Sequence, residues 1–255
     1  MEKLLLDGKW ELHYAPEHAG KTTAQAVKED PAYTHIEANV PGNAELDLYA
    51  AGKAPEPFWG TNLYAFRPCE FYEWWYTRTF VAPQALADRG AVLCLDGVDT
   101  FSTVYLNGTA VGETDDMMLE YRFDVTEALR EGENEIAVHI RSTVNAARNM
   151  DYPMGVRGPG WEHTDEMICV RKPGHMFGWD IAPRFVSAGL WRSVSICPKR
   201  DTYFKEVYMT TLRADRERAQ VLLKFRFAAE DPMLEGFAVQ VRGTCAESSF
   251  CETVR

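Results

Sequence analysis

Apolar and polar residues alternate, or apolar residues run together, in a series of short stretches along the first 142 residues. β-Branched and aromatic side chains are dense in these stretches, and turn signals separate them. Few helical periods lie between them. The pattern predicts an antiparallel all-β sandwich, with strands or hairpins at residues 9–14, 73–81, 91–98, 101–112, 121–125 and 132–142.

Turn signals locate several connections between these strands. Asn107-Gly108 lies between two apolar runs, which is typical of a two-residue β-hairpin turn. Val40-Pro41-Gly42-Asn43 interrupts the chain, and we expect one or two helical turns at residues 44–51. Residues 15–31 show weak periodicity and are predicted to form a loop.

An aromatic-rich loop is predicted around Pro55 and Pro57. It carries Phe58, Trp59 and Tyr64. Aromatic side chains supply cores more often than binding sites, so we favour packing of this loop onto the sheet over contact with a ligand.

A looser segment, rich in glycine and proline, extends over residues 143–173. A loop of this length in a compact domain is usually functional or mobile. It leads into the run 171–184, which contains Trp179 and Asp180, and then into an apolar strand expected at residues 190–196. We therefore expect the ligand face here.

A second series of alternating stretches begins after residue 200. Strands are expected at residues 203–211, 219–227 and 236–241 and near Phe250, which predicts a second β-sandwich of immunoglobulin-like type. The series is shorter than the roughly 100 residues of such a sandwich, so residues 201–255 are expected to be its N-terminal part. The predicted domains are 1–200 and 201–255.

Composition narrows the class of protein. The chain has 255 residues, of which 46% are hydrophobic and 25% charged, as in soluble globular proteins. The net charge of −11 argues against nucleic acid or an anionic membrane as a partner. The apolar stretch near the N-terminus is too short for a signal peptide, and no run approaches the roughly 20 residues of a spanning helix.

The six cysteines contain no Cys-x-x-Cys pair, and several lie inside strand-like runs. Buried free thiols are therefore expected rather than disulfides or a metal cage, which is consistent with a reducing cytoplasm. The cysteines are Cys69, Cys94, Cys169, Cys197, Cys245 and Cys251.

Trp179 and Asp180 together offer what a sugar requires. The apolar C–H face of a pyranose lies on an indole ring, and a carboxylate accepts hydrogen bonds from its hydroxyls. Glycines and prolines around the pair would hold the loop in shape before a ligand arrives. The competing interpretation is a core tryptophan beside an aspartate in a turn.

Motifs along residues 1–200 occur in a fixed order that resembles glycoside hydrolase family 2. They are Val40-Pro41-Gly42, Asp47-Leu48, Gly60-Thr61-Asn62 and the stretches 75–80, 95–99, 104–108, 111–112, 121–126, 132–136 and 189–194. The resemblance implies an N-terminal sugar-binding domain, a jelly-roll with a galactose-binding-like fold, followed by the start of an immunoglobulin-like domain.

Phe177-Gly178-Trp179-Asp180, with Pro183-Arg184 after it, resembles the β-mannosidase branch of that family. That branch usually has Trp-Gly where this chain has Ile181-Ala182. In such enzymes this loop reaches into the pocket of a catalytic TIM barrel, where its Trp and Asp hold the terminal sugar. The resemblance thus implies that Trp179 and Asp180 bind substrate, with a terminal β-linked sugar and a barrel of the same polypeptide as partners.

No catalytic residue, metal or cofactor is expected in this chain. Retaining glycosidases need two carboxyls roughly 5 Å apart, and the resemblance places both catalytic glutamates on the barrel, beyond residue 255. Asn134-Glu135 precedes an alternating strand, which indicates a turn. The cluster Glu162, His163, Asp165 and Glu166 fits no zinc or EF-hand spacing, and solvated loop charges are favoured over acid/base groups or metal ligands.

Alternatives to this assignment stay open. His175 either contacts ligand or is structural. The chain could be a free-standing carbohydrate-binding module with a complete site of its own. It could also be a structural or homo-oligomerising domain, in which case Trp179 would be buried away from any cleft.

Overall fold

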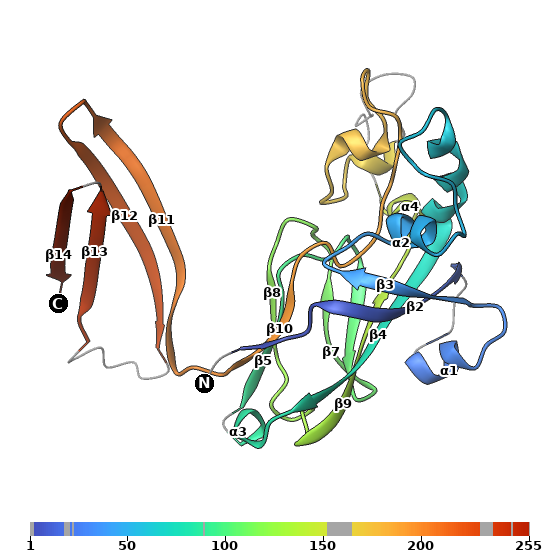
Figure 1. The fold of residues 1–255 in the computed structure, drawn as a ribbon, viewed down its shortest axis with the longest axis horizontal. Helices are drawn as coiled ribbons and strands as arrows, with labels where there is room; N and C mark the ends of the chain where they lie inside the picture. The colour runs from blue at the N-terminus through green and yellow to red at the C-terminus, as the bar shows by residue number, and fades with distance from the viewer. Residues whose placement is uncertain are drawn as a thin grey trace. The chain divides into compact units, whose positions relative to one another are not determined.

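The computed structural model describes residues 3–17, 21, 23–88, 90–151, 165–229, 237–245 and 247–254. The chain divides into two compact units, Met1–Lys199 and Arg200–Arg255, called unit 1 and unit 2 below. Figure 1 shows the strands of both. No helix among these residues is long and apolar enough to cross a membrane.

Unit 1 contains two antiparallel sheets in its described part. The larger has the strand order β3-β2-β4-β9-β6-β7, and the smaller has the order β1-β10-β5-β8. The bounds are β1 (Leu4–Leu5), β2 (Gly8–Pro16), β3 (Thr34–Val40), β4 (Tyr72–Ala82), β5 (Ala91–Leu95), β6 (Ser102–Leu106), β7 (Thr109–Thr114), β8 (Tyr121–Asp124), β9 (Gly132–Ile140) and β10 (Val194–Pro198).

The main core receives alternate side chains of both sheets. Trp74 and Tyr76 of β4 belong to it, together with Leu95 of β5 and Ile196 of β10. Trp75 points to the other face of β4, where it is also fully buried and stacks on His139 at 4.1 Å. The central strand is therefore buried on both faces, and the predicted all-β sandwich is confirmed.

The predicted hairpin turn is also confirmed. Asn107 and Gly108 join β6 to β7 with positive φ angles of 52° and 79°, as a two-residue turn of this kind requires. The Asn107 amide donates hydrogen bonds to the Ala128 carbonyl and to Asn134 Oδ1, both at 2.8 Å.

Short helices occupy several connections. They are α1 (Ala24–Lys28), α2 (Ala44–Ala50), α3 (Gln84–Ala87) and α4 (Thr143–Arg148), with 3₁₀ helices η1 (Asn62–Phe71), η2 (Asp165–Met167) and η3 (Gly174–Phe177). The prediction for α2 is confirmed, whereas α1 and α4 lie in segments predicted as loops. Both start at a side-chain cap, Thr23 or Ser142, but are too short to show a helical period in the sequence.

The predicted packing of the aromatic-rich loop is wrong. Phe58, Trp59 and Tyr64 are 82%, 74% and 73% exposed, respectively. The buried side of this connection comes instead from η1, through Phe66 and Cys69. These two side chains belong to the main core.

The described residues of unit 2 form two antiparallel hairpins. β11 (Thr202–Ala214) pairs with β12 (Ala219–Ala229), and β13 (Val239–Cys245) pairs with β14 (Ser248–Val254). The all-β class predicted for this part is confirmed.

The cysteines are free, as predicted, and Cys69 and Cys94 are buried. Cys169, Cys245 and Cys251 are exposed, so the expected burial is wrong for these three. Two of them lie in the unit 2 hairpins, whose strands are exposed along most of their length, so an apolar pattern there does not bring burial.

Candidate functional site

Trp179 and Asp180 lie at the tip of a loop formed by residues 176–185, called the 176–185 loop below. The Phe185 N–H donates to the Met176 carbonyl at 2.8 Å. Nearer the tip, the Trp179 N–H donates to the Ala182 carbonyl at 2.9 Å, and the Ala182 N–H donates to the Trp179 carbonyl at 3.2 Å. These backbone bonds close a four-residue turn with Asp180 and Ile181 at its outer end.

The tip of this loop is open to solvent. Trp179 is 48% exposed and Ile181 is 92% exposed, and Asp180 is also exposed. The interpretation of Trp179 as a core residue is therefore wrong. An indole face and a carboxylate stand beside each other at the surface of unit 1.

The base of the loop is buried. Phe177 is completely buried and packs with Val144 of α4 and with Val186. Gly178 has a φ of 112°, a conformation that L side chains rarely adopt, so the chain turns there from the buried base to the exposed tip. Phe185 meets Phe66 of η1 edge to face, with ring centroids 5.5 Å apart.

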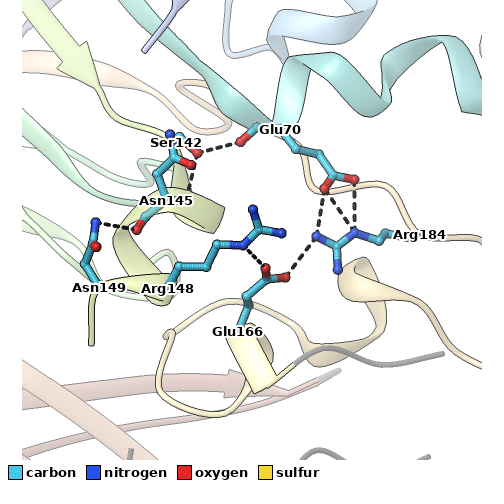
Figure 2. A network of polar contacts seen from close by, with 7 residues as sticks. All are labelled: Glu70, Ser142, Asn145, Arg148, Asn149, Glu166 and Arg184. Atoms are coloured by element: carbon cyan, nitrogen blue, oxygen red, sulfur yellow. Dashed lines mark hydrogen bonds and ion pairs between the residues drawn. The ribbon is translucent and has the colours of Figure 1, made fainter. Parts of the chain in front are cut away.

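A buried ion network fixes the same base (Figure 2). Arg184 donates to Glu70 of η1 through two nitrogens, Nη2 at 2.7 Å and Nε at 3.0 Å from Oε2. Arg184 Nη2 also donates to Glu166 at 3.1 Å, and Arg148 of α4 donates to the other oxygen of Glu166 at 2.5 Å. Arg184 of the loop thus joins η1 to η2, and Glu166 of η2 in turn joins Arg148 of α4.

Burial would lower the pKa of Arg184, but the hydrogen bonds and charges of Glu70 and Glu166 outweigh it and raise this pKa above its ordinary value. The Ser142 hydroxyl ties α4 to η1 by donating to the Glu70 carbonyl at 2.6 Å. Bidentate arginine–carboxylate pairs fix orientation as well as distance. The loop base is therefore held in one geometry.

A second buried pair closes the chain on either side of the loop. Lys172, whose side chain is fully buried, forms an ion pair with Asp99 and donates to the Ser187 carbonyl at 2.8 Å. The Ser187 hydroxyl donates to the other Asp99 oxygen at 2.9 Å. Lys172 and Ser187, which flank the loop in the sequence, are thereby joined through Asp99. The sequence analysis did not predict this contact among the three residues.

The charged cluster at residues 162–166 and His175 were the other candidates from the sequence. Glu166 is 6% exposed and paired with arginines, so its expected role as a solvated loop charge is wrong. Glu162, His163 and the side chain of Asp165 lie outside the described residues. His175 is exposed on η3.

The turn chemistry predicted for Asn134 is confirmed, although Asn134 and Glu135 lie inside β9 and not ahead of it. Its side-chain oxygen accepts from the Arg130 N–H at 2.9 Å, and its amide donates to the Arg130 and Gly132 carbonyls. Glu135 forms an ion pair with Lys28 at 2.5 Å. Neither residue takes part in the candidate site.

A separate cleft of about 810 Å³ lies beside α4. Its lining mixes aromatic, cationic and amide side chains, among them Phe101, His139, Arg141, Arg148 and Asn149. Trp179 and Asp180 are not part of this lining. The described part of unit 1 therefore has at least two surface regions with groups suited to a polar ligand, the tip of the 176–185 loop and the cleft beside α4.

The chain matches the family model described as glycosyl hydrolase 2 galactose-binding domain-like over residues 16–192. β-Mannosidase B of Thermothelomyces thermophilus is 31% identical over 192 residues, which are 75% of this chain and 21% of that protein. A probable β-mannosidase of Caenorhabditis elegans is 30% identical over 177 residues, 66% of this chain and 20% of that protein. The chain thus spans about a fifth of the length of these relatives.

Solved structures of a β-mannosidase and of another glycosidase are also similar to this chain. The β-D-mannosidase of Dictyoglomus thermophilum superposes with a TM-score of 0.76 and 28% identity, covering 100% of this chain and 31% of that one. An exo-chitosanase of Amycolatopsis orientalis, 18% identical, has a TM-score of 0.59 over 100% of this chain and 27% of that one, and shows the fold alone. Because the family model covers most of unit 1, the chain belongs to the glycosyl hydrolase 2 galactose-binding domain-like family.

Proposed function

We propose that this chain is the non-catalytic sugar-binding part of an exo-acting β-mannosidase of glycoside hydrolase family 2. Its 176–185 loop contributes Trp179 and Asp180 to a sugar pocket completed by a catalytic barrel of the same polypeptide. The observation that carries this proposal is the contrast within the loop, because an exposed aromatic–carboxylate tip stands on a base fixed by buried ion pairs.

The role of each residue follows from its chemistry. Trp179 supplies a flat apolar surface for the C–H face of a pyranose, and Asp180 accepts hydrogen bonds from sugar hydroxyls. A hydrogen bond to a charged group contributes about 1.5–3 kcal/mol. The ion network at the base keeps the loop in place, so less entropy is lost when the sugar binds.

Mannose is the sugar that we propose, because relatives of this chain are named β-mannosidases. Ile181 and Ala182 follow Asp180 in the tip, where the β-mannosidase branch usually has Trp-Gly. The smaller side chains would leave more room beside the sugar than an indole does.

The first test is made in the full-length enzyme that contains this chain. Asp180→Ala is expected to reduce kcat/KM for an aryl β-mannoside by about ten- to a hundredfold, because a charge-assisted hydrogen bond to the sugar is lost. Asp88→Ala, which changes an exposed aspartate at the end of α3, is the matched control and should leave kcat/KM unchanged. Equal kcat/KM in both variants would contradict the proposed role of Asp180.

The second candidate function is a carbohydrate-binding module that works without a barrel. The cleft beside α4 favours it, because its aromatic and polar lining and its volume of about 810 Å³ fit a small sugar. Ligand-observed NMR of the 255-residue chain with mannose, glucosamine, galactose and glucuronic acid separates the two functions. Binding that survives Asp180→Ala but is lost in Arg141→Ala would favour the module.

Binding lost only in Asp180→Ala would place a self-sufficient site on the 176–185 loop. No binding of any of the four sugars would favour the shared pocket, since the contacts of half a pocket need not offset the entropy of association.

A further inference from the structure

Two histidines and a glutamate gather on the outer face of the larger sheet, away from the 176–185 loop. Glu11 and His13 are alternate residues of β2, and His35 lies directly opposite His13 on the edge strand β3. Their neighbours Leu12 and Ile36 belong to the main core. Side chains alternate across a strand, so the three polar groups share the opposite face.

The three side chains lie close enough to share one ion. The His13 and His35 rings stack with centroids 4.7 Å apart and an interplanar angle of 24°. Glu11 Oε2 lies 3.9 Å from His13 Nε2. One ligand atom from each of the three residues lies within 4.8 Å of the other two.

His13 supplies an independent sign that a ligand belongs here. The residue is 8% exposed, and its Nε2 atom is buried without a hydrogen-bond partner. Buried polar atoms in folded proteins nearly always have a partner, because an unpaired one costs about 1–3 kcal/mol. Nε2 faces the Glu11 carboxylate at 3.9 Å, too far for a hydrogen bond but suitable for a shared ion.

The charges around the cluster also fit a cation. Lys28 Nζ forms a long ion pair with Glu11 at 3.8 Å and a short one with Glu135 at 2.5 Å, so Glu135 can keep the lysine when the Glu11 carboxylate turns to a metal ion. Thr77 Oγ1 donates to Glu11 Oε2 at 3.4 Å, which orients the carboxylate.

We propose that Glu11, His13 and His35 bind a divalent transition-metal ion, with Zn²⁺ as the best match to two imidazole nitrogens and one carboxylate. Zinc accepts this ligand set in tetrahedral geometry, with a fourth position for water. Bond lengths of about 2.0–2.1 Å require ligand atoms roughly 3.3 Å apart. Glu11 and His35 are exposed, so their side chains can close the remaining distance while buried His13 stays in place.

The ion would fasten the edge strand β3 to β2. Calcium and magnesium are excluded as natural occupants because both prefer sets of oxygen ligands. Binding to the folded state alone raises the unfolding temperature in proportion to the logarithm of the metal concentration. The site is therefore detectable without any enzymatic assay.

The test uses the 255-residue chain with the exposed Cys169, Cys245 and Cys251 changed to serine, so that thiols do not compete for the metal. After treatment with a chelator, Zn²⁺ is titrated by calorimetry. One ion per chain is expected, with a raised unfolding temperature. His35→Gln should weaken binding about tenfold or more, whereas His175→Gln, which changes an exposed histidine elsewhere, should leave the affinity unchanged.

A measurement on the parent chain avoids dependence on the variants. Zn²⁺ should shift the side-chain ¹⁵N resonances of His13 and His35 but not that of His175. Failure of about 100 μM Zn²⁺ to bind, or equal affinity in the parent chain and in His35→Gln, would overturn the proposal, as would unchanged His13 and His35 resonances.

Discussion

Buried carboxylates of unit 1 differ in charge according to their partners. Glu70 is paired with Arg184, and Asp99 is paired with Lys172. Glu45 of α2 is 1% exposed and accepts a long hydrogen bond from the Ala188 N–H at 3.4 Å. Burial therefore outweighs the other influences and raises the pKa of Glu45 to about 8, so this side chain carries a proton at neutral pH.

Glu45 should make the stability of unit 1 fall as the pH rises. The unfolded chain loses this proton near pH 4.5, whereas the folded chain keeps it until about pH 8. Between these values the folded state holds more protons, so this group lowers the free energy of unfolding by about 1.4 kcal/mol per pH unit. Glu45→Gln should remove this decline, and its advantage over the parent should grow from pH 5 to pH 8 and then level off.

Urea unfolding at several pH values checks the Glu45 prediction. Tryptophan fluorescence reports on unit 1 alone, because every tryptophan precedes residue 200. Glu113→Gln, at an exposed position of β7, is the control and should follow the pH dependence of the parent. The prediction fails if Glu45→Gln follows it as well.

At the scale of elements, the 176–185 loop depends on segments far away in the chain. Arg184 meets Glu70 across 114 residues and Glu166 across 18. The strands, the Asn107-Gly108 turn and α2 were predictable because each follows from neighbouring residues. The ion network was not predictable in the same way, since no local pattern indicates which distant charges meet inside a fold.

The aromatic-rich loop also shows that a local sequence pattern does not determine which side chains are buried. The sequence shows that Phe58, Trp59 and Tyr64 are aromatic, but not that they stay exposed while Phe66 and Cys69 enter the core. Trp179 and Asp180 were singled out because their chemistry suits a sugar. Their position on a loop with a buried base required the structure.

Arg184→Met should destabilise unit 1 by about 3–5 kcal/mol, because Glu70 and Glu166 are then left buried with a lost ion-pair partner. Urea unfolding followed by tryptophan fluorescence measures this loss. Arg122→Met, which removes an exposed ion pair with Glu120, is the matched control and should cost less than about 1 kcal/mol.

Addition of Glu70→Gln to Arg184→Met should restore part of the lost stability, since the variant then buries one charge fewer. Similar losses for Arg184→Met and Arg122→Met would show that the network does not hold the loop base.

At the scale of the whole molecule, the segments that hold the 176–185 loop lie together within unit 1. Residues 165–185 and η1, yellow to orange and cyan in Figure 1, lie at one end of the sandwich, where Arg184 contacts Glu70 and Phe185 contacts Phe66. Tyr64 of η1 and Trp179 of the loop are 73% and 48% exposed, and tyrosine and tryptophan are enriched at interfaces with other molecules or domains. This arrangement agrees with the proposed partnership with a catalytic barrel.

The 255-residue chain alone should therefore not hydrolyse an aryl β-mannoside, whereas the full-length enzyme should. A retaining glycosidase needs an acid/base carboxyl and a nucleophilic carboxyl roughly 5 Å apart. The loop tip brings one carboxylate, Asp180, and the buried Glu70 and Glu166 beneath it are occupied by arginines. Release of the aryl group is measured for both proteins at equal concentration, with Asp180→Asn of the chain as a check against contaminating enzyme. Turnover by the chain that disappears in Asp180→Asn would place catalysis on this loop. It would refute the proposal that this chain binds the sugar while a separate barrel hydrolyses it.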